Sequence, residues 1–146
     1  MTTTIKSLRL TRLIRADPAT VFDAWTQPEH LKRWSAPEGL DVDAVEVDLR
    51  VGGRYRIRME APDGGHHTAV GEYREIDRPN RLSYSWKWAE PGNDHYETRV
   101  TVEFHPRDGS TEVILTHELF PDADIAGKHD EGWTSCLNRL EALFSA

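Results

Sequence analysis

The 146-residue sequence contains little that could hold it together apart from a hydrophobic core. It has a single cysteine, Cys136, so no disulfide can form within the chain, and such cysteine usage fits a reducing compartment. No run of apolar residues approaches the ~18 that a membrane-spanning helix requires. The opening segment, MTTTIKSLRLTRLI, lacks the apolar stretch of a secretion signal. These absences predict a cytoplasmic globular protein with no membrane span.

Positive charge is also scarce. The chain has 18 Lys and Arg residues against 25 Asp and Glu residues, which gives a net charge of -7 at pH 7. Broad nucleic-acid binding depends on neutralising phosphates with Lys and Arg, so this balance argues against it. Arginine gathers only at Arg50, Arg54, Arg56 and Arg58, which we interpret as the solvated face of a strand. The length and the 38% hydrophobic content predict one globular domain over residues 1–146.

Turn signals divide the chain into a strand, two short helices, six strands and a long helix. Residues 7–14 alternate as a strand does, and Asp17 with Pro18 can begin a helix that Pro28 ends before a second one. The turns GG, DGGHH, DRPN, EPGND and RDGS separate the six later strands, which predicts an antiparallel sheet. Residues 122–144 have apolar side chains in steps of three and four, with Asp122 or Asp124 as the cap. We therefore predict an α+β fold with the long helix packed on a curved sheet.

The stretch RLSYSWKW, residues 81–88, raises the main question about function. Leu82, Tyr84, Trp86 and Trp88 would share one face of a strand, and Ser83, Ser85 and Lys87 would face water. Such an aromatic face could be a nucleic-acid platform, a partner surface, core, or the wall of a ligand pocket. The net charge argues against the first of these, and the covering helix favours the last two.

Five segments, taken in order, resemble a known family. They are IRADPATVFDAWTQPEHLKRW, VDLRVGGRYRIRM, GEYREIDRPNRLSYSW, TEVILTHEL and HDEGWTSCLNRLEALF. The chain is similar to the SRPBCC (START-like, Bet v 1-like) superfamily, and within it to the group of the activator of Hsp90 ATPase (AHSA1). The resemblance implies a helix-grip fold with a mainly apolar cavity between the long helix and the sheet. One departure is Ser35-Ala36 before Pro37, where the family often has a second tryptophan and a glycine.

The side chains expected around this cavity are mostly aromatic or aliphatic, with a few polar ends, as ligand pockets tend to be. They are Trp25, Tyr55, Ile57, Met59, Tyr73, Tyr84, Trp86, Trp88, Val102, Phe104, Leu115, His117, His129, Gly132, Trp133 and Cys136. From composition alone, the same side chains could instead fill a solid core, so both interpretations stay open.

His117 is the candidate for acid–base chemistry. It shares the parity of Val113 and Leu115, so it should point inward, where a neutral imidazole can bond a ligand or act as a base near pH 7. The alternative is a core histidine whose nitrogens are satisfied by a backbone carbonyl or a tyrosine hydroxyl. The sequence does not decide between them.

Three other features of the sequence are expected to be structural rather than catalytic or metal-binding, apart from one alternative for Gly132. Cys136 is expected to be a small buried hydrophobe, because His129 lies two helical turns away and cannot act as its base. Gly132, inside the long helix, either lets the helix approach the sheet closely or leaves space for a ligand beside Trp133. His66, His67 and Asp63 lie in a glycine-rich turn without a second ligand pair at a zinc-like spacing, so we expect no metal.

Three functions are compatible with these features. The first is binding of an apolar or amphipathic small molecule, lipid- or polyketide-like, without a cofactor. The second is a cyclase or hydrolase that uses the same cavity, with His117 or a pocket tyrosine acting on the substrate. The third is a cofactor of an Hsp90-type chaperone, which is disfavoured because in the eukaryotic cochaperones such a domain follows a separate N-terminal one. Homodimer formation is compatible with the sequence, which offers no decisive patch.

Overall fold

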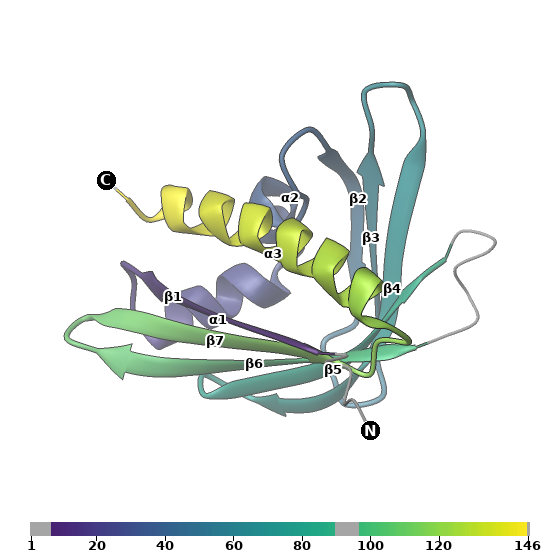
Figure 1. The fold of residues 1–146 in the computed structure, drawn as a ribbon. Coiled ribbons are helices and arrows are strands. Elements are labelled where there is room, and N and C mark those ends of the chain that lie inside the picture. The colour runs from purple at the N-terminus through teal and green to yellow at the C-terminus, as the bar shows by residue number, and fades with distance from the viewer. Residues whose placement is uncertain (1–6, 90–96, 146) are drawn as a thin grey trace.

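In the computed structural model, which describes residues 7–89 and 97–145, seven strands form one antiparallel sheet that curves around a long helix (Figure 1). The elements along the chain are β1 (Leu8–Ile14), α1 (Pro18–Thr26), α2 (Pro28–Trp34), β2 (Asp41–Val47), β3 (Arg54–Glu60), β4 (His66–Asp77), β5 (Arg81–Trp88), β6 (Thr98–Arg107), β7 (Ser110–Glu118) and α3 (Ala123–Leu143). The predicted element order and the α+β helix-grip fold are confirmed. The predicted turn EPGND lies outside the described residues.

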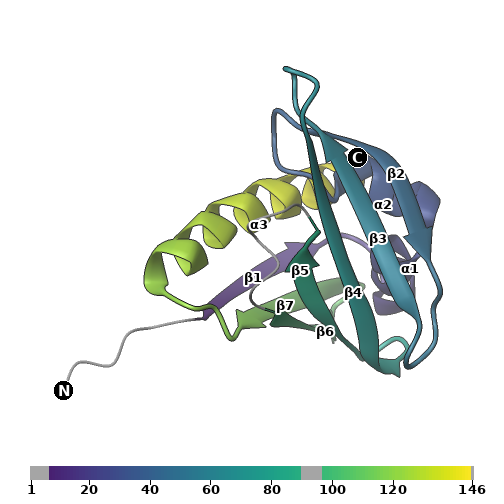
Figure 2. The same ribbon diagram turned by 90° about the vertical axis from the view of Figure 1, so that its right-hand side faces the viewer.

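The sheet has the strand order β1-β7-β6-β5-β4-β3-β2, so the first strand pairs with the last and β2 forms the far edge. Helix α3 crosses the concave side, and α1 and α2 fill the space beside its C-terminal half (Figures 1 and 2). Two indoles tie the short helices in place. Trp34 Nε1 donates to the Ala24 carbonyl at 2.9 Å, and Trp25 Nε1 donates to the Tyr84 hydroxyl at 3.1 Å. The aromatic strand β5 lies at the centre of the sheet.

The helix starts follow from the capping residues. Asp17 caps α1 by accepting from the Thr20 backbone N–H, and Pro18 occupies the first turn, where a missing N–H costs nothing. Asp122, one of the two caps predicted for α3, accepts from the Ile125 N–H at 2.9 Å. Asp17 therefore marks the start of α1, and Asp122 marks the start of the long helix α3.

The alternation predicted for the strands is confirmed on both faces of β3. Tyr55, Ile57 and Met59 are buried, whereas Arg54 and Arg56 are exposed. A strand with one covered face and one face in water has this pattern. The arginine-rich segment is therefore a solvated surface, as predicted, and the opposite face contributes to the interior under α3.

The prediction that Ser83 and Ser85 face water is wrong, because both are only 5% exposed. Their strand is central, so neighbouring strands carry side chains on either side of them. Ser83 lies opposite Thr101 and Ser85 opposite Arg99 on β6, and the Ser85 hydroxyl accepts from the Glu72 N–H on β4 at 2.8 Å. A short side chain between longer ones is covered even on the outer face of the sheet.

A close approach of β3, β4 and β5 occurs at Gly71. This residue lies opposite Tyr55, whose hydroxyl donates to the Ser85 carbonyl at 2.6 Å. A Cβ atom at position 71 would overlap that carbonyl oxygen and would lie 2.6 Å from the Tyr55 ring. Gly71 is thus the residue that lets the tyrosine lie flat across β4 and reach β5.

Candidate functional site

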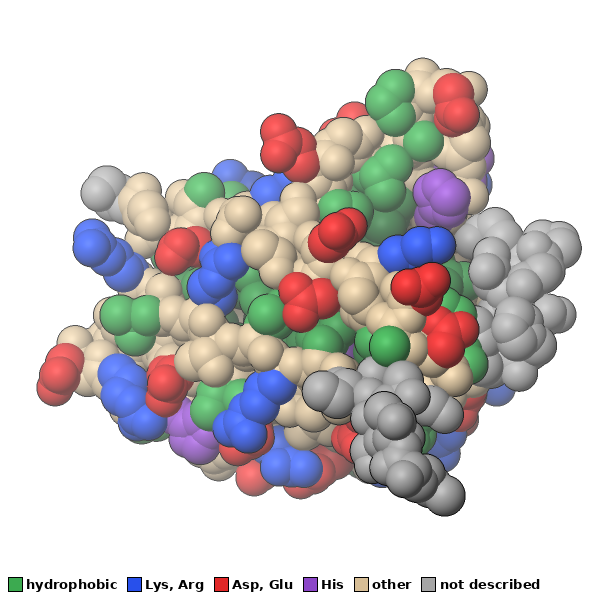
Figure 3. All heavy atoms as spheres, viewed as in Figure 1, with side chains coloured by type: hydrophobic (Ala, Val, Ile, Leu, Met, Phe, Trp, Pro, Cys, Tyr) green, Lys and Arg blue, Asp and Glu red, His purple; other side chains and the backbone are tan. Residues whose placement is uncertain are grey.

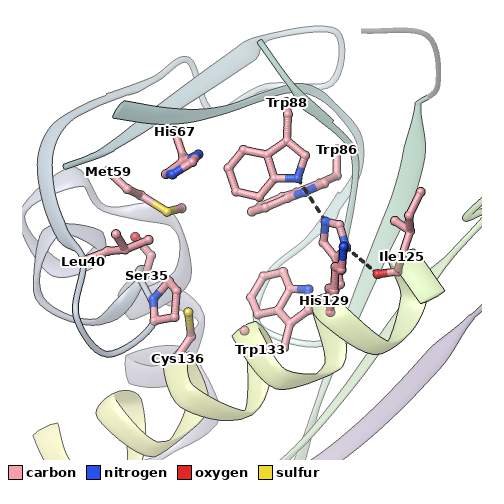
Figure 4. Close-up of a pocket in the computed structure, with 13 residues that line it drawn as sticks. Ser35, Leu40, Met59, His67, Trp86, Trp88, Ile125, His129, Trp133 and Cys136 are labelled. Carbon is pink, nitrogen blue, oxygen red and sulfur yellow. Dashed lines mark hydrogen bonds between the residues drawn. The ribbon is translucent and has the colours of Figure 1, made fainter. Parts of the chain in front are cut away.

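A cavity of about 550 Å³ lies between α3 and the β3–β5 part of the sheet (Figure 4). The segment after α2 closes one side of it. The cavity is lined by Ser35, Pro37, Leu40, Met59, His67, Trp86, Trp88, Ile125, Lys128, His129, Gly132, Trp133 and Cys136. In the space-filling view, a hollow with hydrophobic side chains opens between α3 and the β3–β4 hairpin (Figure 3). The surface around it carries charged and histidine side chains.

Seven of the predicted cavity residues line this space. They are Met59, Trp86, Trp88, His129, Gly132, Trp133 and Cys136. Six other lining residues were not predicted from the sequence, namely Ser35, Pro37, Leu40, His67, Ile125 and Lys128. A signal was available for two of them, because Ile125 and Lys128 precede Gly132 by seven and four residues and so share its side of the helix. For the others, no sequence pattern indicates a position on the cavity wall.

The remaining predicted residues lie deeper. A second cavity of only about 20 Å³ is lined in part by Trp25, Tyr55, Ile57, Tyr73 and Tyr84. It shares Trp86, Trp133 and Ser35 with the larger one, so it lies behind that aromatic wall. Val102, Phe104, Leu115 and His117 are buried in the core and line neither space. The covered face of the sheet is therefore solid toward β6 and β7 and open toward β3.

All five tryptophans of the sequence form one continuous series of ring contacts across the interior. Ring centroids are 4.5 Å apart for Trp34 and Trp25, and 6.3 Å apart for Trp25 and Trp133. The series continues from Trp133 to Trp86 at 5.4 Å and from Trp86 to Trp88 at 5.5 Å. Stacked, tilted and edge contacts of this kind stabilise aromatic clusters beyond simple burial. The last three rings of the series form the aromatic wall of the cavity (Figure 4).

His117 holds this wall from behind through a chain of hydrogen bonds. Trp133 Nε1 donates to His117 Nδ1 at 2.9 Å, which leaves the other ring nitrogen to carry the proton. His117 Nε2 then donates to the Thr98 hydroxyl at 2.7 Å, and that hydroxyl donates to the Trp86 carbonyl at 2.9 Å. The geometry is that of a satisfied core histidine, with a hydroxyl and an indole as partners. Burial, and to a smaller extent the nearby His129, lowers the pKa of His117 well below its ordinary value.

His129 makes a similar pair at the cavity itself. Its Nδ1 donates to the Ile125 carbonyl at 2.9 Å, and its Nε2 accepts from Trp88 Nε1 at 3.0 Å (Figure 4). Burial lowers the pKa of His129, and the bond to the Ile125 carbonyl offsets part of that effect. Both histidines are thus neutral acceptors for tryptophan indoles. Each has both ring nitrogens engaged within the protein.

The free energy of unfolding is expected to fall as the pH is lowered from 7 to 5. Both His117 and His129 have lowered pKa values in the folded chain, so the unfolded chain binds more protons in this range. Their contribution is complete above about pH 6.5. Below that pH, each histidine that stays neutral in the folded chain adds a slope approaching about 1.4 kcal/mol per pH unit. The pKa values of Asp17 and Asp43 are also lowered, so these carboxylates remain ionised throughout.

Urea denaturation at half-unit pH intervals measures this slope. The His129→Gln variant, whose amide oxygen can still accept from Trp88, should show a shallower slope than the wild type. A free energy of unfolding that stays constant from pH 7 to pH 5 would contradict the prediction.

Gly132 and Cys136 occupy the helix side of the cavity. A Cβ atom at Gly132 would meet no atom within 4 Å, so the close-approach interpretation is wrong and the glycine leaves open space. Burial raises the pKa of the Cys136 thiol to about 12, which keeps it protonated. A protonated thiol is a poor nucleophile, in keeping with the interpretation of Cys136 as a small hydrophobe.

One group of side chains on the sheet surface has the composition of a metal site. Asp43, Glu60 and His66 have ligand atoms within 4.8 Å of one another. Arg58, however, already holds Asp43 through two hydrogen bonds of 3.0 Å, and all three members of the group contact solvent. The cluster is adequately explained as a set of surface ion pairs.

A long helix held in the concave face of a curved antiparallel sheet, over an aromatic cavity, defines the helix-grip class of domains. The profile of the family described as "Activator of Hsp90 ATPase homolog 1-like protein" matches residues 15–145, so the chain belongs to this family. The predicted membership of the SRPBCC superfamily is thereby confirmed. Family membership supports a ligand-binding type of domain in general and names no particular ligand.

Solved structures of similar proteins share the fold of this chain. A protein from Chromobacterium violaceum is 29% identical, with a TM-score of 0.89, over 97% of this chain and 98% of that one. An AHSA1 protein from Silicibacter pomeroyi is 28% identical, with a TM-score of 0.84, over 93% and 95% of the two chains. An AHSA1-like protein from Aeromonas hydrophila, 24% identical with a TM-score of 0.75 over 92% and 90%, shares the fold. Comparison with curated proteins found no match.

Within the described ranges, 7–89 and 97–145, none of the helices has the length and apolar character needed to cross a membrane.

Proposed function

We propose that the cavity between α3 and the sheet binds an apolar or amphipathic small molecule. Its volume of about 550 Å³ falls within the range of ligand pockets, which is ~300–1,000 Å³. Its wall combines large aromatic rings with only a few polar groups, as such pockets do. The observation that carries the proposal is the cavity itself, since a protein interior is otherwise packed to the density of an organic crystal.

The cavity is better suited to binding than to acid–base catalysis. The described residues that line it include no carboxylate. His129 has both nitrogens engaged, and His117 lies behind the wall rather than on it. A general base must be within hydrogen-bond reach of the proton that it abstracts, and neither of these two histidines is free to meet this requirement. His67 also lines the cavity, but the described lining residues offer no carboxylate to orient it or to act as its acid–base partner. Aromatic burial, rather than proton transfer, is what the arrangement offers to a ligand.

Filling the cavity should abolish binding without unfolding the protein. N-phenyl-1-naphthylamine, a neutral dye that fluoresces in apolar surroundings, serves as the probe. We expect Gly132→Trp to weaken its binding at least about tenfold, which corresponds to ~1.4 kcal/mol, because the indole would occupy the space of the probe. Fluorescence titration measures the dissociation constant, and circular dichroism checks that the fold is retained.

Gly127→Trp is the matched control. Gly127 lies in the same helix, is exposed and does not line the cavity, and a Cβ atom added there would have no neighbour within 4 Å. This variant should bind the dye as the wild type does. Failure of the wild type to bind the dye, or equal affinities for the two variants, would count against a ligand cavity.

A further inference from the structure

We propose that the ligand carries a carboxylate, and that Lys128 and His67 hold this group at the rim of the cavity while its apolar body lies against the tryptophans. This inference rests on the proposed function and specifies the chemical class of the ligand. Its basis is the set of polar groups in the lining that are still available to a bound molecule.

Most polar groups of the lining are already used within the protein. The indoles of Trp88 and Trp133 donate to histidines, and the Ser35 hydroxyl donates to the Leu31 carbonyl at 2.6 Å. Trp86 Nε1 has no hydrogen-bond partner among the described residues, but neighbouring atoms cover it, so a molecule in the cavity does not reach it. The inner part of the cavity therefore presents mainly apolar surface, which favours binding of an apolar part of the ligand.

Lys128 and His67 are the exception, since both line the cavity and both are exposed. They come from different elements, α3 and β4. The His67 ring points toward the cavity, with its centroid 6.3 Å from that of Trp88 (Figure 4). Both side chains offer N–H donors, and one carries a full positive charge. Donors at the rim above an apolar interior match a ligand with an acceptor group at one end.

Lys128 forms no ion pair with any of the described residues. Within the described part of the chain, no carboxylate lies within 4 Å of its ammonium group. Helical geometry places Lys128 on the cavity side, in the stripe that also contains Ile125 and Gly132, whereas Asp124 and Glu131 lie further round toward solvent. A cation in the wall of an otherwise apolar cavity, with no carboxylate partner among residues 7–89 and 97–145, favours an anionic ligand over a neutral one.

Two probes with the same apolar body test this inference. 1-Naphthylacetate carries a carboxylate, and 1-naphthylacetamide replaces it with a neutral amide. Isothermal titration calorimetry of the wild type should give a carboxylate affinity about five- to tenfold higher than the amide affinity, as a partly exposed charge-assisted contact provides. The preference should shrink at 1 M NaCl, where the Debye length falls to about 3 Å.

Lys128→Met keeps the aliphatic stem and removes the charge. It should reduce the preference to about twofold or less, chiefly by lowering the carboxylate affinity. Lys32→Met, at an exposed position on α2 that does not line the cavity, is the matched control and should retain the wild-type preference. His67→Gln should lower the carboxylate affinity by less than Lys128→Met does, since it keeps a donor and removes no permanent charge.

The outcomes separate the two proposals. Equal wild-type affinities for the two probes, or an unchanged preference in Lys128→Met, would overturn the carboxylate assignment and leave the cavity function standing. If N-phenyl-1-naphthylamine and both naphthyl probes fail to bind the wild type, the cavity function fails, and the carboxylate assignment fails with it.

Discussion

Gly71→Ala is expected to lower the free energy of unfolding by about 3 kcal/mol or more. The added methyl group would overlap the Ser85 carbonyl oxygen on the neighbouring strand and press on the Tyr55 ring. Overpacking a rigid interior typically costs about 1–3 kcal/mol, and here one of the overlapping atoms belongs to the backbone and cannot turn aside. The Tyr55 bond to the Ser85 carbonyl would be lost as well. Guanidinium denaturation followed by circular dichroism measures the change.

The same substitution in α3 provides the control. Gly127→Ala places a methyl group where no atom lies within 4 Å, and it should raise the free energy of unfolding by about 0.5–1 kcal/mol through helix propensity. The two glycine-to-alanine changes are therefore expected to have opposite signs. If Gly71→Ala differed from the wild type by less than about 1 kcal/mol, β4 and β5 would have to separate more easily than their packing indicates.

His117→Ala is expected to destabilise the protein by about 3–5 kcal/mol. The imidazole is fully buried, so its removal leaves a cavity of the kind that costs this much for large core side chains. It also leaves the Trp133 indole without an acceptor and the Thr98 hydroxyl without its donor, and a buried unsatisfied donor adds about 1–3 kcal/mol. Denaturation gives the free energy, and near-ultraviolet circular dichroism reports whether the tryptophan packing loosens.

The matched variant is His105→Ala. His105 lies on β6 with its side chain 40% exposed and contacts Glu103 at 3.1 Å, an arrangement that is typically worth no more than about 1 kcal/mol. Equal losses for the two variants would mean that the chain of hydrogen bonds behind the tryptophan wall contributes little to stability.

The sequence predicted the fold and the orientation of most interior side chains, because these depend on local periodicity. Tyr84 and Trp86 alternate with polar residues along one strand, and Trp133 recurs at helical spacing with Cys136 and Leu140. The spacing of apolar residues along a strand or helix shows which face of that element is buried, and it does so without knowledge of the element that packs against it. The inward direction of His117 was predicted in the same way and is confirmed by its complete burial.

The limits of the cavity could not be predicted in this way. Whether an inward side chain meets another side chain or empty space depends on how closely two elements pack, and that distance is set by residues far apart in the chain. Ser35 and Leu40 face Cys136 across about a hundred residues of sequence, and nothing local signals that meeting. The burial of Ser83 and Ser85 likewise depends on neighbouring strands rather than on their own alternation.

The unbroken series of five tryptophans gives the protein an optical reporter of its own. Indole rings this close exchange excitation energy, so light absorbed at Trp34 can be emitted from Trp88 at the other end of the series. Three of the rings form the cavity wall, and Trp88 and Trp133 each donate to a neutral imidazole. A molecule entering the cavity would therefore perturb the emission of the whole series, and the occupancy of the site could be followed by light without any label.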